Sequence, residues 1–370
     1  MILTDLDELA AWMRLLATPG MGRGTARQLL TAFGTPQGVF EASSTQRRAC
    51  VDAITATALD AEPPRWSALL AQTRSWLDGG PERDWVALGD ARYPQALLQS
   101  ADPPLLLYTQ GRCELLNTPS LAIVGSRNPT PQGGENARAF AEHLGRAGLT
   151  IVSGMALGID GAAHSGALAA GVPTIAVIGT GPDIVYPRAH RELAHRIVER
   201  GLIVSEFVLG TPPLAQNFPA RNRIIAGLSL GTLVVEAALE SGSLITARHS
   251  LEAGREVFAI PGSIHSPQSR GCHALIKQGA KLVDDARDVL EELRWSAQPE
   301  LAPDGPLPTD TTSKPDPLIT ALGFEPVGID QLQARTGWPT AELSARLLEL
   351  ELQGQVARLP GGRYQRIAAA

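Results

Sequence analysis

The feature that most constrains the fold is a repeated pattern in which a short apolar run ends at glycine or a small polar residue and a helical pattern usually follows. Because these runs are apolar throughout, both faces of the sheet they form must be covered. The pattern predicts an α/β fold with a doubly wound, mostly parallel sheet. Its expected strands are 121–124, 149–152, 174–178, 202–204, 233–235 and 257–260.

The first unit of this pattern carries a candidate anion-binding loop. Its strand ends at Gly125, and Ser126 and Arg127 follow at the turn. Open α/β sheets bind ligands at the carboxyl ends of their strands. A helix expected from about Gly134 would offer backbone N–H groups to an anion, and Arg127 would add a planar set of donors suited to phosphate. The alternative is an arginine that pairs with a neighbouring helix.

Two further loops follow the next strands. The loop 153–164 holds Gly154 and two more glycines, which would let a backbone approach an anion closely or pack tightly. Asp160 and His164 in it are spaced i, i+4, which favours a capping or helix-face pair over a metal site. The loop 179–188 ends at Arg188, a phosphate contact or a solvated side chain. The GxxxxGK[ST] motif of P-loop NTPases is absent from the sequence.

Residues 216–227 are the most distinctive stretch. Arg221 and Arg223 flank Asn222 near an expected helix start, so two guanidinium groups would lie beside backbone donors. Just before them, Phe218 would stack on a base or anchor the core. The candidate nucleic-acid-binding set is completed by Asn217 in this stretch and by Ser243, in a Ser-Gly-Ser start of a later helix.

Charge and composition narrow the class of protein. The net charge is −6, yet residues 121–281 carry 14 Lys and Arg against 11 Asp and Glu, while both flanking stretches are acidic. Aromatic residues make up 5%, which disfavours binding built mainly on stacking. Three separated cysteines without CxxC predict neither a metal site nor disulfides. With no basic leader and no apolar run near membrane length, the sequence predicts a cytoplasmic protein without a membrane span.

The ends of the chain predict additional modules. Residues 1–80 read as a helical module, in which 18–30 resemble a helix-hairpin-helix unit. Residues 81–295 would form the central domain, and 296–317, rich in Pro, Asp and Thr, a linker. Residues 318–370 predict a winged-helix domain. Its second helix holds Glu342, Glu349 and Glu351 against Arg346 alone, so we expect this domain to serve protein contacts or to tune the central domain, with little affinity for duplex DNA.

Several motifs occur in an order that resembles the DprA/Smf family. They are IVGSRNPTPQG, SGMALGIDGAAH, GTGPDIVYP, FPARNRIIAGLS, VVEAALESGSLITARHSLEAGREVFAIPG and GCHALIKQGA. The resemblance implies a Rossmann-like, cytosolic homodimer without cofactor or catalytic turnover, preceded by a SAM-like or helix-hairpin-helix-like module. It implies a protein that binds and protects incoming single-stranded DNA and loads the RecA recombinase during natural transformation. By position, Gly125, Ser126 and Arg127 would be the family's phosphate-binding loop, with a second basic site within 217–223.

A rival interpretation is an enzyme. Gly231, Thr232 and Glu236 are similar to the GGxGTxxE loop of lysine-decarboxylase-like nucleotide phosphoribohydrolases, which cleave an N-glycosidic bond. Here the preceding glycine pair is replaced by 228–230, Leu-Ser-Leu, and the Glu lies one residue later. A shared fold does not imply a shared function. A transcription factor is a third interpretation, which rests on the winged helix alone.

Overall fold

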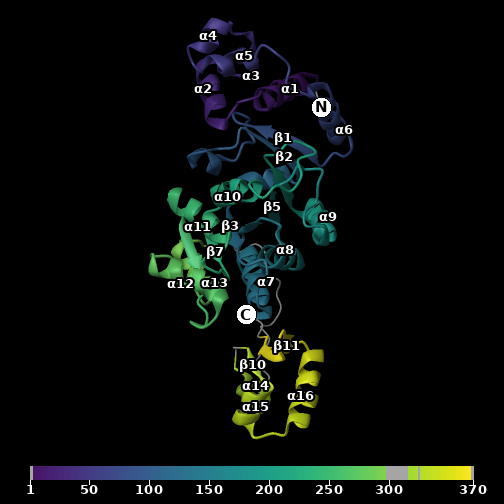
Figure 1. Ribbon diagram of the computed structural model, residues 1–370, viewed down its shortest axis with the longest axis vertical. Helices are drawn as coiled ribbons and strands as arrows, with labels where there is room; N and C mark the ends of the chain where they lie inside the picture. The colour runs from purple at the N-terminus through teal and green to yellow at the C-terminus, as the bar shows by residue number, and fades with distance from the viewer. Residues whose placement is uncertain (1–2, 297–315, 324–325, 368–370) are drawn as a thin grey trace. The chain divides into compact units, whose positions relative to one another are not determined.

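The computed structural model describes residues 3–296, 316–323 and 326–367. The chain divides into two compact units. One comprises Met1–Thr118 with Ile175–Ser229, and the other comprises Pro119–Thr174 with Leu230–Ala370. Figure 1 labels most of their helices and strands.

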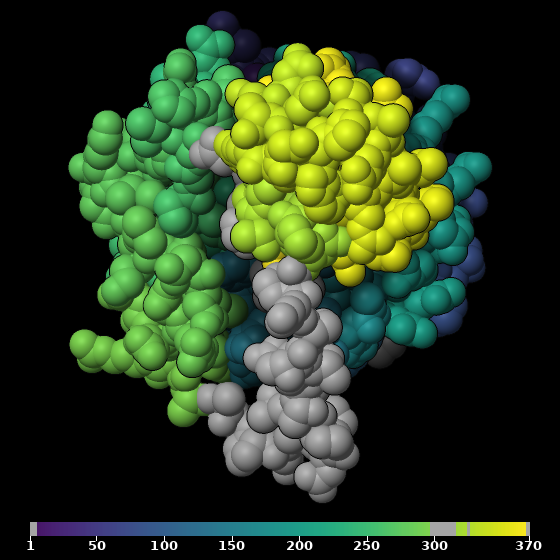
Figure 2. All heavy atoms as spheres, turned by 90° about the horizontal axis from the view of Figure 1, so that it is seen from below, coloured from purple at the N-terminus to yellow at the C-terminus, as the bar shows by residue number. Residues whose placement is uncertain are grey.

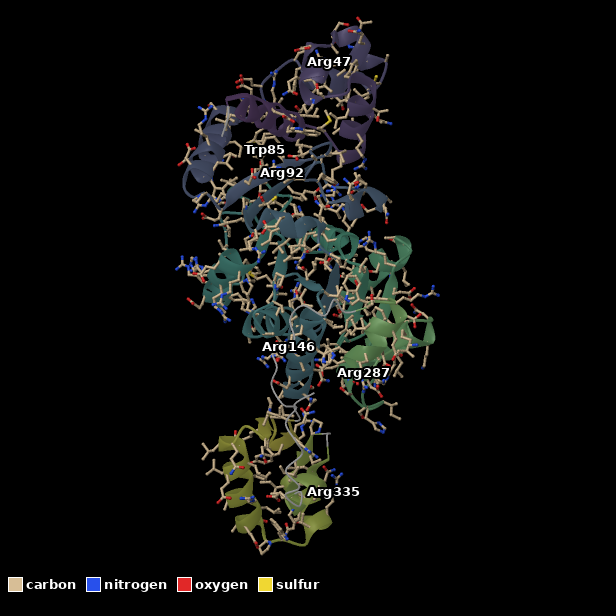
Figure 3. All side chains as sticks on the ribbon, turned by 180° about the vertical axis from the view of Figure 1, so that it is seen from behind. Arg47, Trp85, Arg92, Arg146, Arg287 and Arg335 are labelled. Carbon is tan, nitrogen blue, oxygen red and sulfur yellow. The ribbon has the colours of Figure 1, made fainter. Side chains whose placement is uncertain are left out.

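The first unit begins with a helical part packed around an apolar core. Helix starts are fixed by side chains of Thr35, Ser43 and Asp52, which accept hydrogen bonds from backbone N–H groups of the first turn. Trp85, from the first strand, contributes to the same core (Figure 3). The helices are α1 (Leu3–Ala17), α2 (Arg23–Phe33), α3 (Pro36–Glu41), α4 (Ser44–Arg48), α5 (Ala53–Ala58) and α6 (Trp66–Asp78).

The strands of the first unit lie in the order β1-β2-β6-β5. β2 (Leu106–Gly111) pairs antiparallel with both β1 (Arg83–Ala87) and β6 (Leu202–Ser205), whereas β6 and β5 (Thr174–Ile178) are parallel. The unit also contains α9 (Arg191–Arg200), α10 (Asn217–Leu228) and the 3-10 turns η1 (Gln95–Gln99), η2 (Cys113–Asn117) and η3 (Arg188–His190).

An ion-pair network joins α2 to α10 within the first unit. Arg223 donates to Glu206 over 2.5 Å and to Asp102 over 3.1 Å. Asp102 also accepts from Arg23 over 2.7 Å and from Arg27 over 2.6 Å. Burial raises the pKa of Asp102, but hydrogen bonds from Arg27 and Arg223 outweigh burial and the net shift is downward. The side chains of Arg223 and Glu206 are each 10% exposed, so this pair is shielded from solvent.

We expect Glu206→Gln to lower the free energy of unfolding by about 2 kcal/mol, because it leaves the buried Arg223 guanidinium with half of its negative partners. Urea unfolding followed by tryptophan fluorescence measures this change. Glu114→Gln is the matched control, since its pair with Arg112 is 65% and 50% exposed and should contribute less than about 0.5 kcal/mol. Equal losses in both variants would contradict the account.

The second unit contains the strands β4-β3-β7-β8-β9 in that order, and each strand pairs in parallel with its neighbour. α7 and α8 pack side by side against the apolar core of this unit (Figure 1). The strands are β3 (Ser120–Val124), β4 (Thr150–Ser153), β7 (Gly231–Val234), β8 (Glu256–Ala259) and β9 (Lys281–Leu282). The helices are α7 (Pro131–Arg146), α8 (Ile159–Ala169), α11 (Ser243–Glu252), η4 (Pro267–Ser269), α12 (Arg270–Lys277) and α13 (Ala286–Glu292).

The C-terminal part is a winged-helix domain with its own apolar core, drawn in lime to yellow in Figure 2. Its helices are α14 (Pro317–Leu322), α15 (Ile329–Thr336) and α16 (Thr340–Leu352). The strands β10 (Val327–Gly328), β11 (Val356–Leu359) and β12 (Arg363–Arg366) form an antiparallel sheet in the order β10-β12-β11. The turn between β11 and β12 contains Gly361 and Gly362, both with positive φ.

The predicted mostly parallel α/β fold is confirmed, and all six predicted strands are present with ends shifted by at most two residues. α7 begins at Pro131 rather than near Gly134, because the Thr130 side chain caps it and proline suits the first helical position. The predicted linker 296–317 lies mostly outside the described residues. No described helix combines the length and apolar character needed to cross a bilayer.

Candidate nucleic-acid interface

The loop after β3 is held by short backbone contacts. The Ser126 N–H donates to the Glu236 carbonyl over 2.7 Å, and the Ser126 carbonyl accepts from the Ile159 N–H over 3.1 Å. The Ser126 hydroxyl accepts from the Asn128 N–H over 3.1 Å. Ser126 is buried by these contacts, whereas Arg127 is exposed. The loop therefore presents Arg127 from a fixed backbone.

The N-terminus of α7 already carries a carboxylate. The two carboxylate oxygens of Glu236 accept from the Thr130 N–H over 2.9 Å and from the Thr130 hydroxyl over 2.6 Å. The Thr130 hydroxyl in turn accepts from the Gly133 N–H over 3.0 Å. Burial raises the pKa of Glu236, and the hydrogen bonds from Thr130 oppose that rise only in part.

Backbone N–H groups of the glycine-rich loop after β4 also donate to a carboxylate. One carboxylate oxygen of Asp160 accepts from the Gly154 and Ala156 N–H groups, each over 3.2 Å. Both donors precede α8, whose N-cap Gly158 has no side-chain cap hydrogen bond, so Asp160 orders the loop before the helix rather than capping the helix. His164 is also engaged, because its Nδ1 lies 2.7 Å from the Thr174 hydroxyl. The described residues contain no group of His, Cys, Asp and Glu arranged to hold a metal ion.

These contacts correct one sequence-based expectation. The backbone N–H groups expected to await an anion at the start of α7 and in the second loop instead donate to Thr130, Glu236 and Asp160. A buried backbone N–H without a partner costs free energy, so the chain supplies its own acceptors. Recognition of an anion at this edge of the second unit then falls to side chains, and Arg127 is an exposed cation there.

In the first unit, α10 begins beneath the loop after β5. The Asn217 side chain donates to the Gly179 carbonyl over 3.1 Å. The Phe218 ring lies against Gly179, where an added Cβ would come within 3.1 Å of it. Tyr186 packs on Phe218 with ring centroids 5.7 Å apart, and Tyr186 is 48% exposed. Sequence reasoning missed Tyr186, although its place in the GTGPDIVYP loop was a signal.

The arginines of α10 point inward. Arg221 is 4% exposed and donates to the Val177 carbonyl of β5. Asn222 is buried beside it, and Arg223 lies in the ion-pair network with Asp102 and Glu206. In this structure both guanidinium groups bind acceptors of the chain itself.

The remaining candidates differ in exposure. Arg188 is exposed at the first residue of η3. Ser243 is 8% exposed, and its hydroxyl lies 2.7 Å from that of Ser241, whose oxygen also accepts from the Ser243 N–H. Of the eleven predicted site residues, Arg127 and Arg188 are thus the exposed cations.

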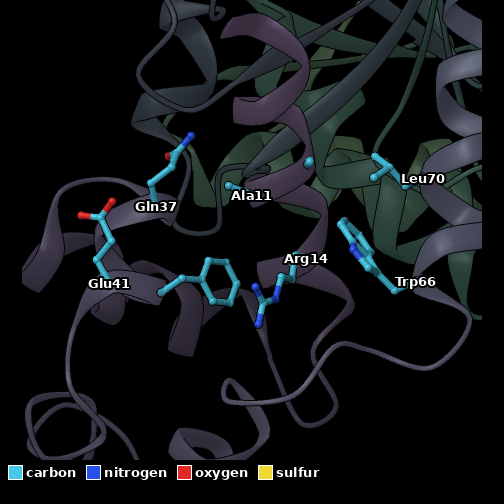
Figure 4. A pocket seen from close by; sticks show the side chains of 8 residues that line it. Ala11, Arg14, Gln37, Glu41, Trp66 and Leu70 are labelled. Carbon is cyan, nitrogen blue, oxygen red and sulfur yellow. The ribbon is translucent and has the colours of Figure 1, made fainter. Parts of the chain in front are cut away.

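A separate hollow of about 350 Å³ lies in the helical part of the first unit (Figure 4). The Arg14 guanidinium stacks 4.2 Å from the centre of the Phe40 ring, and Trp66 forms another wall. None of the predicted site residues lines it. This hollow is therefore not part of the candidate interface.

The fold and the loops together define the class of protein. It is a mostly parallel α/β protein with a winged-helix domain, in which carboxylates accept hydrogen bonds from the loops at the strand ends. The family described as DNA recombination-mediator protein A matches residues 84–294, and the DprA winged helix domain matches 302–362. The chain belongs to the DprA/Smf family.

Individual relatives agree with this assignment. Protein Smf of Escherichia coli is 45% identical over 301 residues, which cover 80% of each chain. The X-ray structure of DprA from Streptococcus pneumoniae matches with a TM-score of 0.66 and 37% identity, covering 79% of this chain and 99% of that one. A Helicobacter pylori DprA structure, described for its single-stranded DNA binding mode, matches with a TM-score of 0.53 and 31% identity over 58% of this chain and 98% of that one.

We expect Gly158→Ala to displace the Arg127 loop. Gly158 has φ of +81°, and an added Cβ would lie 2.3 Å from the Ser126 carbonyl oxygen and 2.7 Å from that of Arg127. The matched control is Gly171→Ala at the other end of α8, where φ is +75° but nothing lies within 4 Å. The control should lose about 1 kcal/mol of stability from the backbone conformation alone.

The Gly158 variant should lose at least about 1 kcal/mol more, because backbone atoms must move. It should also show faster amide exchange in the loop. Urea unfolding and hydrogen exchange measure both effects, and equal losses in the two variants would refute the close packing of the loops.

Glu236 should give stability a defined pH dependence. Between its ordinary pKa of 4.5 and its raised value, the folded protein keeps a proton that the unfolded chain has lost. Rising pH through this range therefore lowers the free energy of unfolding. We expect the wild type to lose stability relative to Glu236→Gln as pH rises above 4.5 in paired urea titrations. A relative gain by the wild type would mean that burial does not dominate at this carboxyl group.

Proposed function

We propose that this protein binds single-stranded DNA through its backbone, without reading its sequence. The observation that carries the proposal is Arg127, an exposed residue on a loop whose backbone is held by hydrogen bonds to Glu236 and Ile159. A guanidinium suits phosphate oxygens. Family membership supports a DNA-processing role in transformation, and the H. pylori relative is described as binding single-stranded DNA.

The other candidate residues divide by exposure. We assign phosphate contact to Arg188 and base stacking to Phe218 with Tyr186, because stacking tolerates any base. The other candidates are mostly buried, or are glycines without a side chain to contact DNA, and we propose that they support the loops. These are Gly125, Ser126, Gly154, Asn217, Arg221, Asn222, Arg223 and Ser243.

The wider role rests on the family. We propose that the protein is a cytoplasmic homodimer that protects incoming DNA and loads RecA onto it. We also propose that its domains have the boundaries predicted from the sequence: 1–80, 81–295 and 318–370, with 296–317 as a linker. Gel shifts of single-stranded and duplex DNA, with and without RecA, test the DNA preference and the transfer. Sedimentation at micromolar concentration tests the dimer, and a monomer throughout would overturn that part.

The enzyme interpretation finds less support. Both carboxylate oxygens of Glu236 accept from Thr130, so the residue that would act on an N-glycosidic bond orders a helix start instead. We therefore infer a binding protein without catalysis. Incubation with nucleoside monophosphates tests this inference directly, because released free base would restore the phosphoribohydrolase alternative.

We expect Arg127→Ala to weaken binding of an oligothymidine strand about tenfold, or about 1.4 kcal/mol, through loss of charge-assisted hydrogen bonds. Arg146→Ala is the matched control with the same charge change (Figure 3). Arg146 is 58% exposed in the last turn of α7 and pairs with Glu142. It should change affinity less than about twofold. Fluorescence anisotropy measures both variants, and equal effects would assign binding to net charge alone.

Salt dependence should report the phosphate contacts. If about three to five phosphates are neutralised, log K against log salt should fall with a slope of roughly −2 to −4, at about 0.7 per phosphate. Arg127→Ala should make the slope shallower by about 0.7. A flat plot for the wild type would exclude backbone contacts as the source of affinity.

A further inference from the structure

α16 of the winged-helix domain has two apolar faces, of which the fold uses one. Leu343, Leu347 and Leu350 are fully buried in the core of the domain. Ala341, Ala345, Leu348 and Leu352 are exposed, and we call them the α16 stripe. Leu348 is 56% exposed and Leu352 is 82% exposed. The core is complete without the stripe, so these side chains are available to something else.

The spacing of the stripe is that of a helix-packing seam. Its members are separated by four, three and four residues, which places them on one side of α16 over three turns. At 1.5 Å per residue the stripe is about 16 Å long. A surface of this size suits a transient partner rather than an obligate one.

The flanks of the stripe are acidic. Glu342 and Glu349 lie on one side and Glu351 on the other, all exposed. Arg346, the one basic residue of α16, lies 2.5 Å from Asp316 and also pairs with Glu349. The charge therefore disfavours DNA phosphates. It also disfavours a second copy of α16, because carboxylates would then face carboxylates.

We propose that the α16 stripe docks an amphipathic helix of another protein, apolar along one face and flanked by Lys and Arg. Such a helix would cover Leu348 and Leu352 and place cations beside the glutamates. This inference is independent of DNA binding by the loops, so either can fail alone.

The test uses the full chain and a fluorescein-labelled synthetic helix of about three heptads, with Leu on one face and Lys on both flanks. We expect Leu348→Ser with Leu352→Ser to weaken its binding at least tenfold. The control, Leu239→Ser with Leu251→Ser, removes leucines that are 58% and 50% exposed in the same unit but outside α16, and should leave affinity unchanged. Because all four side chains are exposed, circular dichroism should be the same in every variant.

A second pair of changes tests the charge. Glu342→Gln with Glu351→Gln should weaken binding several-fold and reduce its salt dependence, and a peptide with Glu flanks should not bind the wild type. Equal affinity of the Lys-flanked peptide for wild type and the leucine variant would overturn the proposal. Loss of self-association in the leucine variant, seen by sedimentation, would assign the stripe to a second copy instead. Weaker duplex DNA binding by that variant would assign it to nucleic acid.

Discussion

The candidate interface depends on two carboxylates that accept hydrogen bonds from backbone N–H groups at strand ends. Asp160 holds the loop after β4, and Glu236 holds the start of α7. In nucleotide-binding α/β proteins such N–H groups face a phosphate of the cofactor. Here the chain provides the negative charge itself, so the loops are ordered without a ligand and Arg127 is presented from a fixed backbone.

The arginines of α10 show how position decides the role of a cation. Arg221 and Arg223 have the sequence context of an anion site, yet the first binds the Val177 carbonyl and the second binds Asp102 and Glu206. Breaking a shielded pair leaves an uncompensated charge, so these contacts resist replacement by a solvated phosphate. Arg127 and Arg188 are both exposed, each in its own unit, so a phosphate can approach either side chain from solvent. Contacts of this kind are weak, salt-dependent and independent of sequence.

The sequence predicted the order of strands and helices well, because buried parallel strands read as apolar runs and end at glycine. It favoured a capping or helix-face pair for Asp160 and His164, whereas Asp160 accepts from the backbone of the preceding loop and His164 lies beside Thr174. The pairing of Arg223 with Asp102 could not be predicted from the sequence, because Asp102 lies 121 residues away in the chain. The closeness of Gly158 to Ser126 was equally hidden, since it depends on the packing of two loops. β2 is not among the predicted strands, because its apolar run directly follows Asp-Pro-Pro, a sequence typical of a connection.

A crystal structure of the protein with a short oligothymidine strand tests the central claim most directly. We expect phosphate oxygens within hydrogen-bonding distance of the Arg127 guanidinium, with Asp160 still bound to the Gly154 and Ala156 N–H groups and Glu236 still bound to Thr130. A phosphate seated on those N–H groups, with either carboxylate displaced, would contradict it. In that case the loops would bind anions through the backbone, as the sequence alone suggested.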